Sequence, residues 1–208
     1  MTAARERLMI QGPAGALEAI VEDPGTADTR YGVVCHPHPK FGGTMDNKVV
    51  TTVARALQGQ GIPTVRFNFR GVGASAGGFD EGSGETDDAD AVASWGDARW
   101  PQRTLVIAGF SFGAMVALRL AQRRLPGQLI TVAPAIRHLD AAAAAVPRCP
   151  WLIVQGDADD VVEPAGVIFW AEHLEPRPRL IVLPGAGHFF HGRLHDVRDA
   201  VIDAIRNG

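Results

Sequence analysis

Short apolar runs alternate with segments of helical spacing along most of this chain. Runs such as Tyr31–Cys35 are typical of buried strands, whereas Val49–Leu57 carries its apolar residues at helical spacing. The pattern predicts strands at Tyr31–Cys35, Pro63–Phe69, Thr104–Ala108, Leu129–Ala133, Trp151–Gln155 and Leu180–Leu183, and helices at Val49–Leu57, Glu85–Trp95, Phe112–Arg124, Pro164–His173 and Arg193–Arg206. Strands that alternate with helices need crossover connections, so we expect an α/β fold with a mostly parallel, twisted sheet and helices on both faces.

The N-terminal stretch has a different pattern. Leu8–Ile10 and Leu17–Val21 flank a turn sequence, G-P-A-G, and predict a hairpin that adds antiparallel strands at one edge of the sheet. We expect residues 1–208 to form a single domain of this kind. Ligands of such sheets bind at the carboxyl ends of the strands, so the chemistry should lie there.

Composition narrows the classes of function. The chain has 208 residues, 46% of them hydrophobic, and a net charge of −3, which suits one globular core and gives no basic stripe for nucleic acid. No apolar run approaches the ~18 residues of a membrane span, and the N-terminus has no signal-peptide pattern. Cys35 and Cys149 adjoin apolar runs and are interpreted as core thiols of a cytoplasmic protein. Apolar edge strands leave homodimerisation open, and the alanine run at 141–145 favours helix.

Ser111 stands in the sequence G-F-S-F-G between the predicted strand Thr104–Ala108 and the predicted helix Phe112–Arg124. A strand that turns at once into a helix forces a sharp bend at the residue between them. Gly109 and Gly113 are small enough to let strand and helix pass closely. The bend exposes the hydroxyl at the positive end of the helix, which predicts Ser111 as a nucleophile rather than a simple helix cap.

A serine nucleophile needs a base and an acid that orients the base. His188 follows the last predicted strand in a loop of small residues, P-G-A-G, and is the predicted base among seven histidines. The acid comes from the segment D-A-D-D at 157–160 beyond the strand Trp151–Gln155, with Asp159 or its neighbour Asp160 favoured. The chain order Ser, Asp, His is that of a triad on this type of sheet.

Acyl transfer also needs donors for the developing oxyanion. The backbone N–H of Phe112, directly after the nucleophile, is expected to be one of them. The other should come from the loop H-P-H-P-K-F-G-G at 36–43. Because the prolines have no N–H, His38 is the natural donor, with Lys40 or Phe41 as alternatives.

Two other patterns point to different chemistry but fit less well. Gly71, Gly73 and Ala76 match a dinucleotide-binding fingerprint, yet a glycine-rich segment follows where that fingerprint needs a helix. His36 and His38 with three histidines at 188, 191 and 195 could ligate a metal, but Gly192 interrupts the second group. We therefore expect no metal and no cofactor. A hydrolase fold without activity, used for binding, is a third alternative.

The motifs together resemble those of the α/β-hydrolase superfamily. The chain is similar to small bacterial members that carry H-P-H-P-x-x-G-G, R-F-N-F-R-G-V-G-x-S and G-F-S-F-G, here at 36–43, 66–75 and 109–113, and P-G-A-x-H-F-F at 184–190. The resemblance spans about 30 to 200. It implies Ser111 as nucleophile, His188 as base and, by the pattern G-x-x-D-x-x-V, Asp159 as acid.

The segment from Ala133 to Cys149 leaves no room for the lid domain that many relatives insert, so the site should be open. Phe41, Phe189 and Phe190 flank the predicted site residues and are expected to line an apolar acyl pocket. We predict a serine hydrolase of small or exposed acyl substrates, a carboxylesterase or thioesterase, with short esters turned over faster than long ones. Peptidase and acyl-transfer chemistry would use the same residues.

Overall fold

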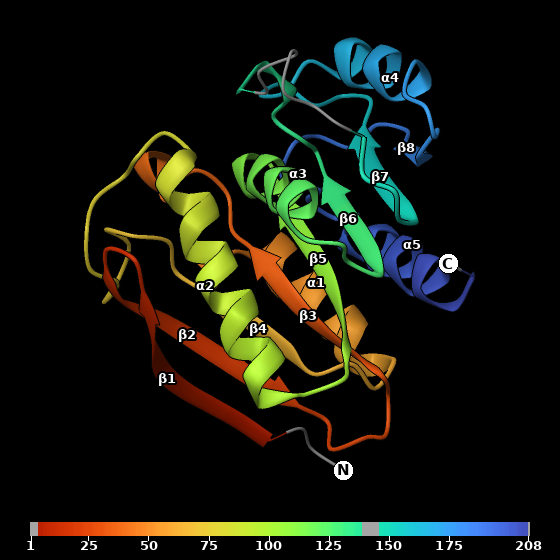
Figure 1. Ribbon diagram of the computed structural model, residues 1–208. Helices are drawn as coiled ribbons and strands as arrows, with labels where there is room; N and C mark the ends of the chain where they lie inside the picture. The colour runs from red at the N-terminus through yellow and green to blue at the C-terminus, as the bar shows by residue number, and fades with distance from the viewer. Residues whose placement is uncertain (1–3, 139–145, 208) are drawn as a thin grey trace.

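The computed structural model describes residues 4–138 and 146–207, and its centre is an eight-stranded sheet in the order β1-β2-β4-β3-β5-β6-β7-β8 (Figure 1). The strands are β1 Ala4–Gly12, β2 Gly15–Asp23, β3 Arg30–Cys35, β4 Thr64–Phe67, β5 Thr104–Phe110, β6 Gln128–Val132, β7 Trp151–Gly156 and β8 Arg179–Leu183. Strands β3 to β8 pair in parallel, while β1 and β2 form an antiparallel hairpin that pairs with β4. The predicted α/β sheet with an antiparallel N-terminal edge is confirmed.

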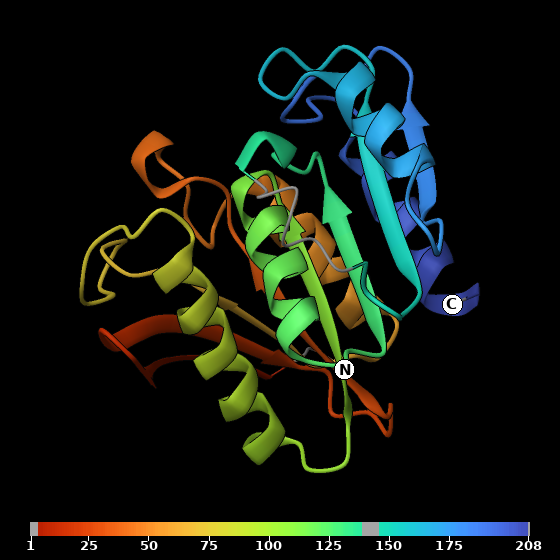
Figure 2. The same ribbon diagram turned by 45° about the horizontal axis from the view of Figure 1, so that its top comes forward.

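Helices cover both faces of the sheet (Figures 1 and 2). The helices are α1 Lys48–Gly59, α2 Ser83–Arg99, α3 Phe112–Arg123, α4 Pro164–Glu172 and α5 Leu194–Asn207, with short 3-10 turns η1 at Pro39–Phe41 and η2 at Ile136–His138. One apolar cluster joins α2, α3 and α4 to one face of the sheet, and a second joins α1 and α5 to the other. The central strands are buried on both sides, which explains why they consist of continuous apolar runs.

Several elements differ from the predicted boundaries. β1 begins at Ala4, four residues before the predicted start at Leu8. Its N-terminal half exposes charged side chains to solvent, so no apolar pattern marks it in the sequence. β4 is shorter than the predicted strand Pro63–Phe69. The backbone N–H of Phe69 donates to the His36 ring instead of to a neighbouring strand. α2 continues beyond the predicted Trp95 to Arg99.

The connection from β6 to β7 runs through residues 133–150, and its described part holds only η2. This connection is too short for a lid domain, as predicted. The alanine run at 141–145 lies outside the described residues. Within the described ranges, every helix is too short or too polar to cross a membrane.

Candidate active site

Ser111 occupies a sharp turn between β5 and α3, with φ 56° and ψ −117°. Residues other than glycine rarely adopt a positive φ, and backbone strain of this kind is concentrated at functional sites. The turn depends on its glycines: a Cβ at Gly113 would lie 2.3 Å from the carbonyl oxygen of His36, and one at Gly109 would lie 2.1 Å from that of Gly113. The two glycines therefore allow the close passage of β3, β5 and α3 that presents the Ser111 hydroxyl.

The His188 ring connects Ser111 to Asp159. His188 Nε2 lies 3.0 Å from Ser111 Oγ, and His188 Nδ1 lies 2.8 Å from Asp159 Oδ2. An ionised carboxylate can only accept, so Nδ1–H donates to Asp159 and Nε2 of the neutral ring accepts the Ser111 hydroxyl proton. The structure thus brings together the three residues that the sequence predicts, from the ends of β5, β7 and β8.

Asp159, rather than Asp160, meets the histidine. Oδ1 of Asp159 accepts the backbone N–H groups of Val161 and Val162 at 2.9 and 2.7 Å, while Asp160 is exposed. Burial opposes ionisation of Asp159, but its hydrogen bonds to His188 and these two N–H groups lower its pKa below the ordinary value. Asp159 is therefore an anion that holds the imidazole in one tautomer and orientation.

The loop that carries His188 is braced from β7. The backbone N–H of Gly185 donates to Asp157 Oδ1 at 2.6 Å, so a second carboxylate of the D-A-D-D segment supports the histidine loop. The His188 ring packs against Phe110 and Phe189, and its centroid lies 5.0 and 5.1 Å from the centroids of those rings. These contacts leave His188 only 4% exposed, so bulk water has little access to the ring.

The loop after β3 presents its backbone beside the nucleophile. The N–H of Lys40 donates to His38 Nδ1 and that of Phe41 to the His38 carbonyl, so both alternatives to His38 are already engaged. The N–H of Phe112 belongs to the first residue of α3 and has no carbonyl four residues back within the helix. Phe112 and His38 remain the predicted oxyanion donors.

His36 orients this loop, a role that the sequence analysis missed. Its Nδ1–H donates to the carbonyl oxygen of Pro37 at 2.6 Å, and its Nε2 accepts the N–H of Phe69 at 3.0 Å. In a trans peptide the N–H points opposite to the carbonyl. Because the Pro37 carbonyl points at the buried His36 ring, the N–H of His38 points the other way. The repeated histidine of the H-P-H-P motif was the signal available in the sequence.

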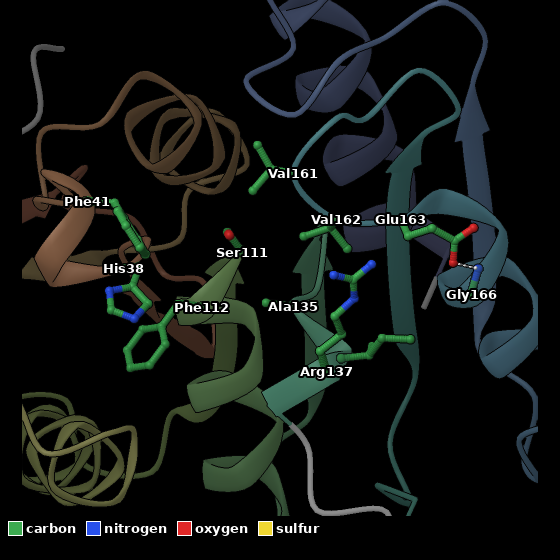
Figure 3. A pocket seen from close by; sticks show the side chains of 11 residues that line it. His38, Phe41, Ser111, Phe112, Ala135, Arg137, Val161, Val162, Glu163 and Gly166 are labelled. Atoms are coloured by element: carbon green, nitrogen blue, oxygen red, sulfur yellow. Dashed lines mark hydrogen bonds between the residues drawn. The ribbon is translucent and has the colours of Figure 1, made fainter.

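A cavity of about 350 Å³ opens at Ser111 (Figure 3). Its lining residues are His38, Phe41, Ser111, Phe112, Ala135, Ile136, Arg137, Val161, Val162, Glu163 and Gly166. Phe41 lies at this cavity as predicted. Phe190 does not: it is fully buried in the apolar cluster under α5, because its backbone turns with φ 51° into the core. Phe189 is also absent from this lining and packs against the rings of Phe110 and His188.

In the part of the chain that the structure describes, the glycine-rich fingerprint and the five histidines do not have the geometry of a dinucleotide site or a metal site. α2 begins at Ser83, well beyond Ala76, and a Cβ at Gly73 would lie 2.5 Å from Asn68 Nδ2 and Glu18 Oε2 rather than beside a phosphate pocket. The glycine-rich loop is therefore packed against β2. Among residues 4–138 and 146–207, no group of three or more histidine, cysteine or acidic side chains is placed to hold a metal ion.

Comparison with known proteins adds the family. The family model "Serine aminopeptidase, S33" matches residues 40–148. The crystal structure of XC6422 from Xanthomonas campestris, described as an α/β serine hydrolase without a lid, is 46% identical, with a TM-score of 0.91 over 97% of this chain and 94% of that one. The chain belongs to the α/β-hydrolase superfamily.

Two further relatives match almost the whole chain. An α/β serine hydrolase homologue from Coxiella burnetii is 45% identical, with a TM-score of 0.91 over 95% of this chain and 96% of that one. The uncharacterized protein RP471 of Rickettsia prowazekii is 32% identical over 96% of this chain and 88% of its own length. The α/β-hydrolase relationship therefore covers both the nucleophile turn and the histidine loop.

Proposed function

We propose that this α/β hydrolase cleaves carboxylic esters, or the closely related thioesters, of small or exposed acyl substrates through an acyl-enzyme. The observation that carries the proposal is the continuous hydrogen-bonded chain from Ser111 through His188 to Asp159 at the mouth of a cavity. Hydroxyl, imidazole and carboxylate in this order form the constellation that activates a serine.

In the proposed reaction, His188 Nε2 takes the proton of Ser111 as Oγ attacks the acyl carbonyl. The N–H groups of Phe112 and His38 stabilise the negative charge that develops on the carbonyl oxygen. His188 then returns the proton to the departing alcohol or thiol. Water attacks the acyl-enzyme with His188 as base, which releases the acid and restores Ser111. Every step uses groups of the chain itself and needs no cofactor.

The direct test is labelling with a fluorophosphonate, followed by peptide mapping, on the wild type and on Ser111→Ala. We expect one adduct, on Ser111, that is absent from the variant. Ser94→Ala is the matched control, because Ser94 is an exposed serine on α2 and its loss should leave labelling unchanged. Folded protein without an adduct would contradict the proposal and favour an inactive hydrolase fold used for binding.

Substrate screening then separates ester cleavage from peptide cleavage. Without a lid domain the cavity is open, so we expect p-nitrophenyl butyrate to be cleaved faster than p-nitrophenyl palmitate. Faster cleavage of the long ester would overturn the proposed substrate size. Hydrolysis of amino-acid amides at a higher rate than of either ester would assign the labelled serine to peptidase chemistry instead.

A further inference from the structure

The cavity at Ser111 has two unlike sides (Figure 3). On one side lie the rings of Phe41, His38 and Phe112, with the ring centroids of His38 4.8 Å from each of the other two. On the other side Arg137 extends from η2, and its guanidinium lies beside Val162 in this view. A substrate bound at Ser111 therefore has an aromatic surface on one side and a cation on the other.

Arg137 and Glu163 are the two residues of opposite formal charge in the lining, and their situations differ. The Glu163 carboxylate caps α4, where Oε2 accepts the N–H of Gly166 at 2.8 Å. The positive end of the helix therefore offsets part of its charge. Within the described ranges Arg137 has no hydrogen bond or ion pair that would neutralise it in the same way. Arg137 is therefore the charged side chain of this lining that is better placed to bind an ion of opposite charge.

We propose that Arg137 binds a carboxylate carried by the acyl substrate, so that the enzyme prefers anionic esters to neutral esters of the same size. This proposal rests on the proposed hydrolase function. A guanidinium presents paired N–H donors that match the two oxygens of a carboxylate. The neighbouring Ala135, Ile136 and Val162 exclude part of the water and strengthen this attraction compared with an open surface.

The test uses two matched pairs of esters. p-Nitrophenyl hemisuccinate and p-nitrophenyl butyrate differ by a carboxylate on the acyl half. 4-Carboxyphenyl butyrate and phenyl butyrate differ by a carboxylate on the alcohol half. We expect the wild type to favour the anionic member of one pair, and Arg137→Gln to reduce kcat/KM for that member by about tenfold while leaving its neutral partner unchanged.

Two variants make the result specific. Arg137→Lys keeps the positive charge but loses the paired N–H donors of the guanidinium, so it should retain part of the preference for anionic esters. Arg198→Gln removes an exposed arginine of α5 that pairs with Asp199, and should leave all four rates unchanged. The preference should also weaken as salt rises, because Arg137 is exposed at the cavity.

Equal effects of Arg137→Gln on the anionic and neutral members of both pairs would overturn the proposal. So would a wild type that favours the neutral ester in both pairs. Fluorophosphonate labelling of the same preparations separates this failure from failure of the hydrolase function, because a labelled Ser111 with no dependence on Arg137 refutes only the anion preference.

Discussion

Two buried histidines stand at carboxyl ends of strands in this molecule, and their hydrogen-bond partners differ in kind. His36, after β3, is bonded to two backbone groups, the carbonyl of Pro37 and the N–H of Phe69. His188, after β8, is bonded to two side chains, the carboxylate of Asp159 and the hydroxyl of Ser111. Both rings are almost completely buried, so burial alone does not distinguish them.

The partners decide what each ring can do. A second proton on the His36 ring would face the amide N–H of Phe69, which can only donate a hydrogen bond. Burial also lowers the pKa of His36, to about 3. A proton gained by His188 comes from Ser111, and the anionic Asp159 stabilises the resulting cation. His36 is therefore a neutral ring that supports the oxyanion loop at 36–43 through its hydrogen bonds. His188 is placed to accept a proton and return it.

The largest expected effect is the loss of activity when His188 is replaced by glutamine, the substitution that is also made at His36 below. His188→Gln removes the base, and we expect kcat for ester cleavage to fall about 10⁴-fold or more, since a serine hydroxyl is a poor nucleophile without one. The free energy of unfolding should change by only about 1 kcal/mol, because Asp159 keeps its hydrogen bonds from Val161 and Val162. Ester kinetics and urea unfolding measure the two effects. A variant with near wild-type kcat would remove His188 from the mechanism.

Asp159→Asn tests the orienting partner and should have the next largest effect. An asparagine amide can donate to Nδ1 of His188 and so favours the tautomer with a proton on Nε2, which cannot accept the Ser111 proton. We expect kcat to fall about 10³-fold, with the fluorophosphonate adduct formed much more slowly.

Asp160→Asn is the matched control for that substitution. Asp160 is adjacent in sequence but exposed, and its loss should change kcat by less than about twofold. Equal loss of activity in both variants would contradict the assignment of Asp159 as the acid that orients His188.

The sequence predicts much of this site because its members follow strands. Each apolar strand is buried on both faces and is easily recognised, so Ser111, Asp159 and His188 fall at strand ends that must meet at one edge of the sheet. The choice between Asp159 and Asp160 needed the backbone of the turn, where only Asp159 accepts N–H groups from Val161 and Val162.

Other features depend on backbone turns or on tertiary neighbours that no local pattern encodes. Phe189 and Phe190 have the same side chain, yet a positive φ at Phe190 directs it into the core while Phe189 stays half exposed. The position of β4 between β2 and β3 depends on pairing between distant segments. Arg137 lies in a segment without a motif and reaches the cavity only because β6 ends beside Ser111.

His36→Gln should reduce stability more than catalysis. Glutamine cannot reproduce both hydrogen bonds of the ring, so it leaves the Pro37 carbonyl or the Phe69 N–H without a partner in the core. We expect the free energy of unfolding to fall by about 2–4 kcal/mol in urea titrations, and kcat to fall about tenfold as the oxyanion loop loosens. His195→Gln, at an exposed histidine of α5, is the control and should change neither quantity. A His36→Gln protein of wild-type stability would show that the His36 ring does not support the loop.

The smallest expected effect is the pH dependence of stability that His36 imposes. Its pKa is about 3 in the folded protein, against 6.5 for an ordinary histidine, so below pH 6.5 the unfolded chain binds a proton that the folded chain rejects until about pH 3. Folding is therefore penalised as the pH falls, by about 2 kcal/mol between pH 7 and pH 5. Asp159 adds almost nothing in that interval, because the ordinary pKa of 3.8 in the unfolded chain and the lower pKa in the folded protein both lie below pH 5. Its contribution to stability is lost only as the pH falls below 3.8. Urea unfolding at pH 7 and pH 5 should show this loss of unfolding free energy in the wild type, and a loss smaller by about 2 kcal/mol in His36→Gln. Equal losses in the two proteins would mean that His36 takes up its proton in the folded state as well.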